Sequence, residues 1–315
     1  VLIIMSTRTS AMGIYREIKS RNLTETYHLS TNMCPAHRFD ALNRIQAKLH
    51  AHESLICVST QLIEAGINID FGAVIRSLAG LDSIAQSAGR CNRHGLRNSP
   101  GSVWIVNPVQ ENLDSLKDIK IGREKAQTVL DNFKANPDVY EGDIIGLRLI
   151  ALYYNLYYSR RENELDYRVG VNTPIGREDD LFNLLSTNTV STQIYQRNSQ
   201  YPLRLAFRQS FQSAARTFQA IDSATRGIIV PYKDGEELIT ELSRPLELKK
   251  QYELIKKAQR YSVNLFINDF DNMMKKGAIR EVQQDTGIYC LAKEYYSSEF
   301  GWSENQVRLM DVLNI

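Results

Sequence analysis

Short apolar segments alternate with stretches of helical spacing over the first 108 residues, and this alternation restricts the possible folds more than any other feature. Residues 1–5 are a continuous apolar run, and further apolar segments follow at residues 27–29, 55–59, 74–77 and 103–106. The stretches of helical spacing are residues 10–20, 35–52 and 83–89. Continuous apolar runs are typical of parallel strands covered on both faces, and strands that alternate with helices require right-handed crossovers. The sequence therefore predicts an α/β fold built on a doubly wound parallel sheet.

The pattern changes after Pro108. Helical spacing predicts helices at residues 112–135, 144–158, 205–221 and 246–259. Short strands are expected at residues 228–230, 263–266 and 287–291. We therefore expect a lobe built on the parallel sheet at residues 1–118, a mostly helical linker region at 119–200, and a small α+β C-terminal domain at 201–315.

The bulk composition excludes several classes of protein. The 315 residues carry a net charge of only +2, so any surface that binds nucleic acid must be local. The four cysteines are far apart and form no Cys-x-x-Cys pair, which argues against a zinc site or a disulfide framework and fits a reducing cytoplasm. No run of eighteen apolar residues occurs, so no membrane span is expected. Because native chains rarely begin inside a core strand, we expect this chain to be the latter part of a longer polypeptide.

Two arginines, Arg90 and Arg93, follow Gly89 closely, and Gln86 precedes them. On a helix, residues three apart leave from the same side. Two guanidinium groups on one face suit a triphosphate, because arginine stays charged and its fork matches phosphate oxygens. A solvated basic turn is the alternative. Gly89 would let a ligand or the backbone come close.

A second motif runs from Ser59 to Asp70 and follows a buried strand. The hydroxyls of Ser59 and Thr60, with backbone N–H groups freed at the strand end, could hold a phosphate. Gly66 allows close approach, and Asn68 or Asp70 could bind a ribose. The alternative is a polar connection with a helix cap.

Hydroxyls also follow two other strands. Thr7 and Arg8 come after the first strand, and Ser30 and Thr31 come after the second, with Arg38 in the helix that follows. Such strand ends suit a track for a nucleic-acid backbone, because phosphate contacts position a strand without reading its sequence. Ser30 or Thr31 could instead cap the helix.

The groups that would build a triphosphate site from the other side are missing from the sequence. There is no Gly-x-x-x-x-Gly-Lys-Ser/Thr loop and no Asp-Glu pair after a strand for magnesium. His50 and His52 face apart on a helix end, so no metal site is expected. The chain thus has arginines to complete a phosphate site without the groups to build one.

The segment at residues 204–218 combines aromatic and basic side chains. Phe207, Phe211 and Phe218 share one helical stripe, for which core packing is expected. Three arginines lie elsewhere on the same stretch, namely Arg204, Arg208 and Arg216. They are either a solvated face, or a surface that covers a DNA channel or meets an acidic partner.

These motifs, in this order, resemble the second RecA-like lobe of superfamily two helicases. Residues 86–93 match their sixth motif, and residues 59–70 match their fifth. The amino-acid sequences of residues 29–38, 59–66 and 86–95 are similar to those of the CRISPR-associated helicase–nuclease of type I systems. Residues 211–216 and 230–232 resemble that family's C-terminal domain, so the likeness covers the second lobe, the linker and the C-terminal domain.

The resemblance implies an ATP-dependent helicase that moves along single-stranded DNA and, with an HD-type nuclease, unwinds and degrades target DNA. ATP and Mg²⁺ would be shared with a first lobe outside this segment, as would the nuclease metal ions. The implied partners are single-stranded DNA, the rest of the helicase–nuclease chain, and a surveillance complex with guide RNA and target DNA. The segment alone would be inactive.

The resemblance also implies a role for each motif residue. Arg90 and Arg93 would reach the ATP phosphates and Gln86 would orient the γ-phosphate or water, while Gly66 and the residues after it would line the ribose. The residues implied on the DNA side are Thr7, Arg8, Ser30, Thr31, Arg38, Ser59 and Thr60. One position departs from the family pattern, because Asn68 stands where an aspartate is usual, so Asp70 would have to supply the acidic contact.

Two other functions remain open from the sequence. The isolated chain could be a non-catalytic module that binds nucleic acid or recruits a partner, which the missing triphosphate loop favours. The motifs also fit an RNA-remodelling helicase of superfamily two. A DNA-stimulated ATPase assay with the first lobe present separates the first alternative, and competition between DNA and RNA separates the second.

Overall fold

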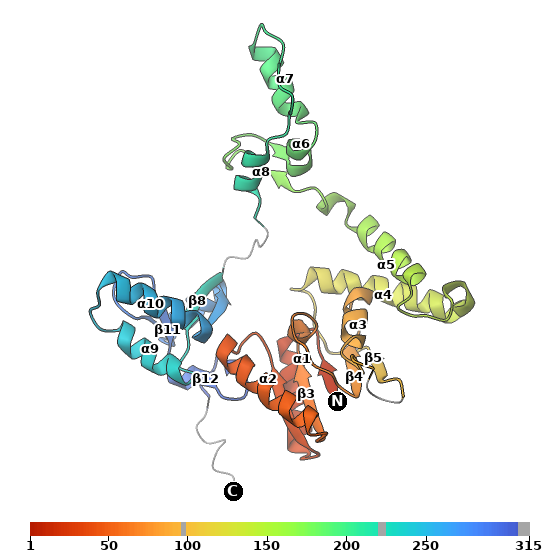
Figure 1. The fold of residues 1–315 in the computed structure, drawn as a ribbon, viewed down its shortest axis with the longest axis vertical. Coiled ribbons are helices and arrows are strands. Elements are labelled where there is room, and N and C mark those ends of the chain that lie inside the picture. Colours follow the sequence, from red (N-terminus) through yellow and green to blue (C-terminus); the bar gives the residue numbers. More distant parts are fainter. Residues whose placement is uncertain (96–98, 220–224, 308–315) are drawn as a thin grey trace. The chain divides into compact units, whose positions relative to one another are not determined.

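A five-stranded parallel sheet forms in the order β2–β3–β1–β4–β5. Its strands are β1 (Leu2–Ile4), β2 (Glu25–Leu29), β3 (Leu55–Ser59), β4 (Ala73–Ser77) and β5 (Ser102–Val106). Every pairing in it is parallel, with Ile3 opposite Val58 on one side and Ile75 on the other. The computed structural model describes residues 1–95, 99–219 and 225–307 (Figure 1). The predicted α/β class with a parallel sheet is confirmed.

Helices cover both faces of this sheet, and successive side chains of each strand pack alternately against one face and the other. Ile3 and Met5 pack with Tyr15 of α1, whereas Leu2 and Ile4 pack in the cluster that contains Ile45 of α2. The helices of this part are α1 (Arg8–Ser20), α2 (Pro35–His50), α3 (Leu81–Ala88) and α4 (Lys117–Ala135), with the 3₁₀ turns η1 (Gln61–Ile63) and η2 (Pro137–Tyr140). The apolar runs thus become strands buried from both sides.

A second sheet lies in the C-terminal part, in the order β10–β11–β8–β9. Its strands are β8 (Thr225–Ile229), β9 (Ser262–Phe266), β10 (Ile279–Glu281) and β11 (Tyr289–Leu291), and its helices are α9 (Asp234–Leu242), α10 (Leu248–Ala258) and α11 (Ile267–Lys275), with η4 (Gln259–Tyr261). Ile229 packs with Leu238 of α9 and Leu254 of α10. Ile228 lies in another cluster, with Phe270 of α11.

That second cluster continues into the start of α2. Cys34 and Ala36 belong to it together with residues of β8, β9 and α11. The start of α2 in the parallel-sheet lobe therefore packs into the apolar core of the C-terminal sheet. Consistent with this, residues 1–150 and 224–315 cluster as one compact unit, and residues 151–223 form the other. The predicted boundaries at 118 and 200 stay predictions.

A short hairpin near the C-terminal end fastens the two sheets together. It consists of β12 (Tyr296–Ser297) and β13 (Gly301–Trp302), after the turn η5 (Lys293–Tyr295). The Trp302 amide donates to the Asn32 carbonyl at 2.9 Å. Gly301 has φ +81°, and a Cβ there would lie 2.1 Å from the same carbonyl oxygen, so only glycine fits.

The second unit begins within α5 (Leu147–Arg160) and is built from short elements. They are η3 (Glu162–Glu164), β6 (Arg168–Val169), β7 (Asp179–Asp180), α6 (Leu181–Leu185), α7 (Thr189–Asn198) and α8 (Phe211–Thr217). Its core consists of Val169, Leu184 and Ala214, with partly buried neighbours. Within the described ranges, no helix of either unit is both long and apolar enough to cross a membrane.

The helix expected at residues 205–221 is shorter than predicted. The structure has only α8 (Phe211–Thr217), and residues 220 and 221 lie outside the described residues. The prediction that the phenylalanines of this stretch pack in a core is wrong, since Phe207 is 79%, Phe211 63% and Phe218 49% exposed. The reason is that only Ala214 and Thr217 of this seven-residue helix are buried, so it cannot bury a stripe that extends from residue 207 to 218.

Candidate nucleotide and nucleic-acid site

The motif after β3 forms a loop in which two isoleucines are buried in the core while Gly66 and Asn68 between them are exposed to solvent. Ile63 and Ile69 are buried in the core of the sheet lobe. Gly66 between them has φ +72°, and a Cβ there would meet no atom within 4 Å. Asn68 is exposed, and its carbonyl accepts a hydrogen bond from Gln46 Nε2 at 2.9 Å. The loop therefore offers an accessible glycine and amide, as a binding loop requires.

The arginine motif follows α3 and joins this loop through the backbone. The Phe71 amide donates to the Arg90 carbonyl at 2.9 Å, and the Asn92 amide donates to the Phe71 carbonyl at 3.0 Å. The Arg93 amide donates to Asp70 Oδ1 at 2.9 Å. The two predicted motifs thus lie side by side and form one continuous surface.

The two arginines of the motif have different surroundings. Arg90 is only 6% exposed, and its guanidinium donates to the Ile67 carbonyl at 2.5 Å and to the Glu64 carbonyl. Burial lowers the pKa of Arg90, and the nearby charge of Arg93 lowers it further. Arg93 is exposed. Arg90 therefore holds the loop, whereas Arg93 is left facing outward.

The expectation that both arginines leave one side of a helix is wrong. The helix α3 ends at Ala88, and Gly89 is its C-cap with φ −63°. Arg90 and Arg93 therefore stand on a turn, where helical spacing no longer sets their directions. Gly89 needs no positive φ, although a Cβ there would approach the Gln86 carbonyl to 3.3 Å. Gln86 lies on the last helical turn and is exposed.

Asp70 has a definite structural role in this surface. Its carboxylate accepts the Arg93 amide and so fixes the turn that carries the arginine. The sequence offered either Asn68 or Asp70 as the ribose contact. That contact stays a prediction for both, with Asn68 the more exposed of the two.

The predicted DNA-side residues follow the neighbouring strands β2, β3 and β1, and so gather at one edge of the sheet. Thr7 caps α1 by accepting the Ser10 amide at 3.1 Å. Arg8 donates to Asn32 Oδ1 at 2.6 Å, and its guanidinium lies 5.7 Å from the Trp302 ring centroid. The C-terminal hairpin therefore helps to hold Arg8 at this edge.

Among the hydroxyl residues at this edge, the structure separates the buried from the exposed. Ser30 is 1%, Ser59 0% and Thr60 7% exposed, and Ser59 donates to the Leu29 carbonyl at 3.2 Å. Thr31 is exposed. Thr31 is thus the most accessible of these four hydroxyls, and the DNA-side roles of all four stay predictions.

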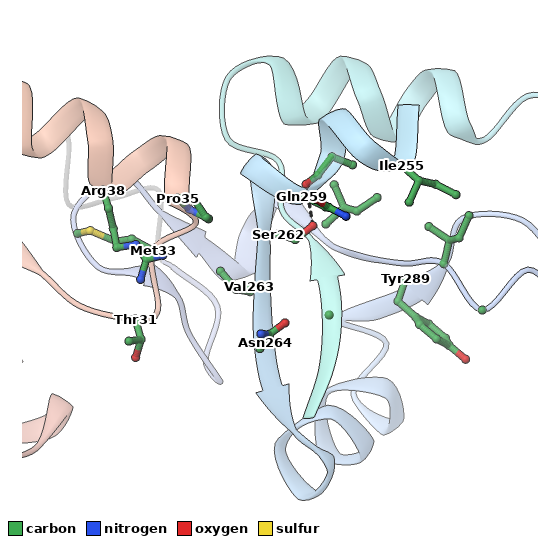
Figure 2. A pocket seen from close by; sticks show the side chains of 15 residues that line it. Thr31, Met33, Pro35, Arg38, Ile255, Gln259, Ser262, Val263, Asn264 and Tyr289 are labelled. Carbon is green, nitrogen blue, oxygen red and sulfur yellow. Dashed lines mark hydrogen bonds between the residues drawn. The ribbon is translucent and has the colours of Figure 1, made fainter. Parts of the chain in front are cut away.

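A groove of about 570 Å³ runs between this edge and the C-terminal sheet. Figure 2 shows Thr31, Pro35 and Arg38 on one wall and Ser262 and Asn264 of β9 on the other. Burial lowers the pKa of Arg38. No ion pair of Arg38 occurs within residues 1–95, 99–219 and 225–307, so its charge is available to an anion in the groove. This groove fits the predicted backbone-phosphate track.

Several polar residues beneath the site were not predicted from the sequence. The buried carboxylate of Glu64 forms an ion pair with buried Arg76 and accepts a hydrogen bond from buried Ser87, and Glu111 is buried beside the start of α1. The available signal was Arg76 itself, a lone charge inside the apolar strand β4. The part of the chain that the structure describes contains no cluster of His, Cys, Asp or Glu suited to a metal ion.

Comparison with known proteins gives the family to which these motifs point. A family model described as "CRISPR-associated nuclease/helicase Cas3, C-terminal" matches residues 1–96. The Cas3 protein of Haloferax volcanii is 44% identical over 61 residues, which are 18% of this chain and 6% of that protein. The Cas3 protein of Methanothermobacter thermautotrophicus is 28% identical over 94 residues, 30% of this chain and 11% of that protein. The resemblance to the CRISPR-associated helicase–nucleases is confirmed.

Solved Cas3 structures share the fold over most of this chain. The crystal structure of T. fusca Cas3 matches 92% of this chain with a TM-score of 0.54 at 13% identity. The T. fusca Cas3–ADP structure matches 86% with a TM-score of 0.51, at 12% identity. At such identities the likeness shows the fold alone. The chain spans 35% of the T. fusca Cas3 chain, so it is similar to the C-terminal portion of a Cas3 protein.

Proposed function

We propose that this chain supplies the second half of the nucleotide site, and one wall of the DNA path, of an ATP-dependent single-stranded DNA translocase in CRISPR interference. A first RecA-like lobe would supply the triphosphate loop and the Mg²⁺ ligands that this sequence lacks. An HD-type nuclease elsewhere in the protein would cut the DNA. The similarity to Cas3 supports a helicase-type role.

The observation that carries the proposal is the position of Arg93. The Asp70 carboxylate fixes the turn that carries Arg93. The guanidinium of Arg90 is hydrogen-bonded to the neighbouring loop, so Arg93 is the arginine of the pair whose side chain is exposed to a bound anion. Gln86 and Gly66 are exposed in the same two motifs. A guanidinium in such a place can stabilise the charge that develops during phosphoryl transfer.

The chain's own residues would act in three ways on the nucleotide side. Arg93 would stabilise charge on the transferred phosphoryl group, and Gln86 would orient the γ-phosphate or the attacking water. The loop at Gly66 and Asn68 would meet the ribose. ATP binding would favour closure of the two lobes, and hydrolysis would remove that preference so that the lobes reopen. T. fusca Cas3 has been crystallised with AMPPNP and with ADP, which supports nucleotide binding in relatives.

On the DNA side, the chain's residues would bind phosphates. Thr31 and Arg38 line the groove of Figure 2, and Arg8 is held at the same sheet edge. Contacts to phosphates are independent of base sequence, as a translocase needs. We further propose that the whole protein acts with a guide-RNA surveillance complex. A structure titled "CRISPR RNA-guided surveillance complex, pre-nicking" contains a chain of similar fold, with a TM-score of 0.50.

The decisive experiment replaces Arg93 in the full-length protein. Arg93→Ala should lower DNA-stimulated ATP hydrolysis by roughly a thousandfold, the scale of a lost arginine at a phosphoryl group, while single-stranded DNA binding stays within about twofold. Arg21→Ala is the control, since Arg21 is an exposed arginine paired with Glu17 on α1. If the Arg93→Ala variant still hydrolyses ATP at the wild-type rate, Arg93 does not act in the nucleotide site and the proposal is wrong.

A further inference from the structure

A completely buried arginine lies at the end of β4, beneath the candidate site. Arg76 is 0% exposed, and its Nε lies 2.7 Å from Oε1 of Glu64, which is 6% exposed. Burial raises the pKa of Glu64, and the charge of Arg76 opposes that rise. Because such buried pairs seldom stabilise a fold more than well-packed apolar side chains would, their positions call for another explanation.

On one side, this pair supports the nucleotide motifs. Ser87 of α3 donates its hydroxyl to Glu64 Oε1 at 2.8 Å. The backbone carbonyl of Glu64 accepts from Arg90, whose other terminal nitrogen bonds Ile67. The side chain and the carbonyl of Glu64 therefore fix the loop of residues 64–67 from two directions.

On the other side, the same guanidinium reaches the strand end that leads to the DNA-side residues. Arg76 Nη1 donates to Ser77 Oγ at 2.8 Å and to Ser6 Oγ at 3.1 Å, and those two hydroxyls lie 3.0 Å apart. The amides of Ser6 and Thr7 both donate to Oε1 of the buried Glu111, at 2.9 and 3.0 Å. Ser6 thus joins Arg76 directly to the turn that presents Thr7 and Arg8.

We propose that Arg76 is a positioning residue that couples DNA contact at the Ser6–Arg8 turn to the nucleotide-side loop at residues 64–67. The proposal rests on the proposed function and deepens it. The guanidinium forms an ion pair with Glu64 on its Nε side and donates hydrogen bonds to both serines through Nη1, so a shift of either turn disturbs a group that the other turn also contacts. Since the groups are buried, water cannot replace a bond that is lost.

The test is Arg76→Lys in the full-length protein. Lysine keeps the positive charge beside Glu64 but replaces the rigid planar fork by one compact ammonium, which cannot reproduce the positions of both Nε and Nη1. We expect ATP hydrolysis without DNA to stay within about threefold, and the stimulation by single-stranded DNA to fall about five- to tenfold, within the usual range of coupling between two sites. The change that AMPPNP produces in DNA affinity should shrink by a similar factor.

A merely structural role would give a different result. In that case Arg76→Lys would lower hydrolysis with and without DNA by the same factor, and the stimulation ratio would not change; that outcome overturns the coupling. A wild-type protein without any DNA-dependent hydrolysis would instead overturn the proposed function, and the coupling with it.

Ser77→Ala tests the same connection without touching a buried charge. It removes the closest hydroxyl from Arg76 Nη1 and should lower the stimulation about two- to threefold. If both side chains act in one network, the double variant should be no worse than Arg76→Lys alone. Effects that multiply would mean that the two residues act separately, which contradicts the coupling. Should Arg76→Lys not fold, an unchanged stimulation ratio in Ser77→Ala contradicts it equally.

Discussion

The two compact units of this chain bury their phenylalanines to different extents. In the unit of residues 1–150 and 224–315, Phe270 is 2% and Trp302 4% exposed, and even Arg76 is fully enclosed. In the unit of residues 151–223, Phe182 is 77% and Phe207 79% exposed. The difference lies in what each unit can bury: the first has two sheets packed against helices, whereas one short strand and two short helices supply the small core of the second.

The surface chemistry of the second unit adds to this contrast. Residues 181–219 contain four arginines and neither aspartate nor glutamate. Exposed aromatic rings interspersed with arginines are typical of surfaces on which single-stranded nucleic acid stacks. The second unit thus leaves aromatic and basic side chains available to a partner.

The largest expected effect tests burial directly, with the same substitution in each unit. Phe270→Ala should lower the free energy of unfolding by about 3–5 kcal/mol, the usual cost of emptying a core position. Phe211→Ala should change it by less than about 0.5 kcal/mol, as at an exposed site. Urea unfolding of the 315-residue chain, followed by circular dichroism, measures both. Equal losses would show that Phe211 is covered in solution, and the contrast would fail.

A smaller effect separates the units by acid. Burial lowers the pKa of both His28 and His37 to about 4, and residues 151–223 contain no histidine. Below about pH 6.5 the histidines of the unfolded chain bind protons, whereas those of the folded chain stay neutral. The free energy of unfolding of the first unit therefore falls progressively from pH 6.5 down to about 4. The loss should be about 1–2 kcal/mol per histidine between pH 7 and 5.

Tryptophan fluorescence reports this loss, since Trp104 and Trp302 both lie in the first unit. His28→Phe keeps a ring beside Tyr15 and Phe300 and should flatten the pH dependence. His94→Gln, at an exposed histidine, should leave it unchanged. A variant at position 28 as acid-sensitive as the wild type would mean that this histidine titrates normally.

The smallest effect concerns the arginines of the second unit. Replacing Arg204, Arg208 and Arg216 by Gln in the full-length protein should weaken single-stranded DNA binding about tenfold. The slope of log affinity against log salt should become less steep by up to about 2, since each phosphate contact contributes about 0.7. Replacing Lys249, Lys250 and Lys257 of α10 removes the same charge from an exposed helix of the first unit. Two equal changes of slope would assign the effect to net charge alone.

The parallel sheet could be predicted because its signal is local. Residues 1–5 read as a doubly buried strand, and Leu2 and Ile3 do face opposite helices. The resemblance implied that residues 59–70 and 86–93 serve one nucleotide site, and the structure joins them through the backbone of Phe71. The directions of the two arginine side chains could not be predicted, because they depend on where α3 ends. The helix ends at Ala88, and in the turn that follows Arg90 is buried against the loop while Arg93 is exposed.

Partners far apart in sequence were also beyond prediction. Nothing near Arg76 in the chain indicates Glu64 or Ser6 as its partners, because Ser6 comes close through the register of β4 against β1 and Glu64 through the loop after β3. The exposure of Phe207 and Phe211 was missed for the opposite reason. Helical periodicity tells which side chains share a face, and it does not tell whether another layer exists to cover that face.

The apolar cluster shared between α2 and the C-terminal sheet sets an order of events during synthesis. Cys34 and Ala36 leave the ribosome long before β8, β9 and α11, with which they pack. Until those strands emerge, the beginning of α2 exposes apolar surface to the cytosol, where nascent chains aggregate or meet chaperones. A truncation or a stalled ribosome anywhere between residues 50 and 225 would leave that surface bare, so expression of the sheet lobe by itself should yield poorly soluble protein.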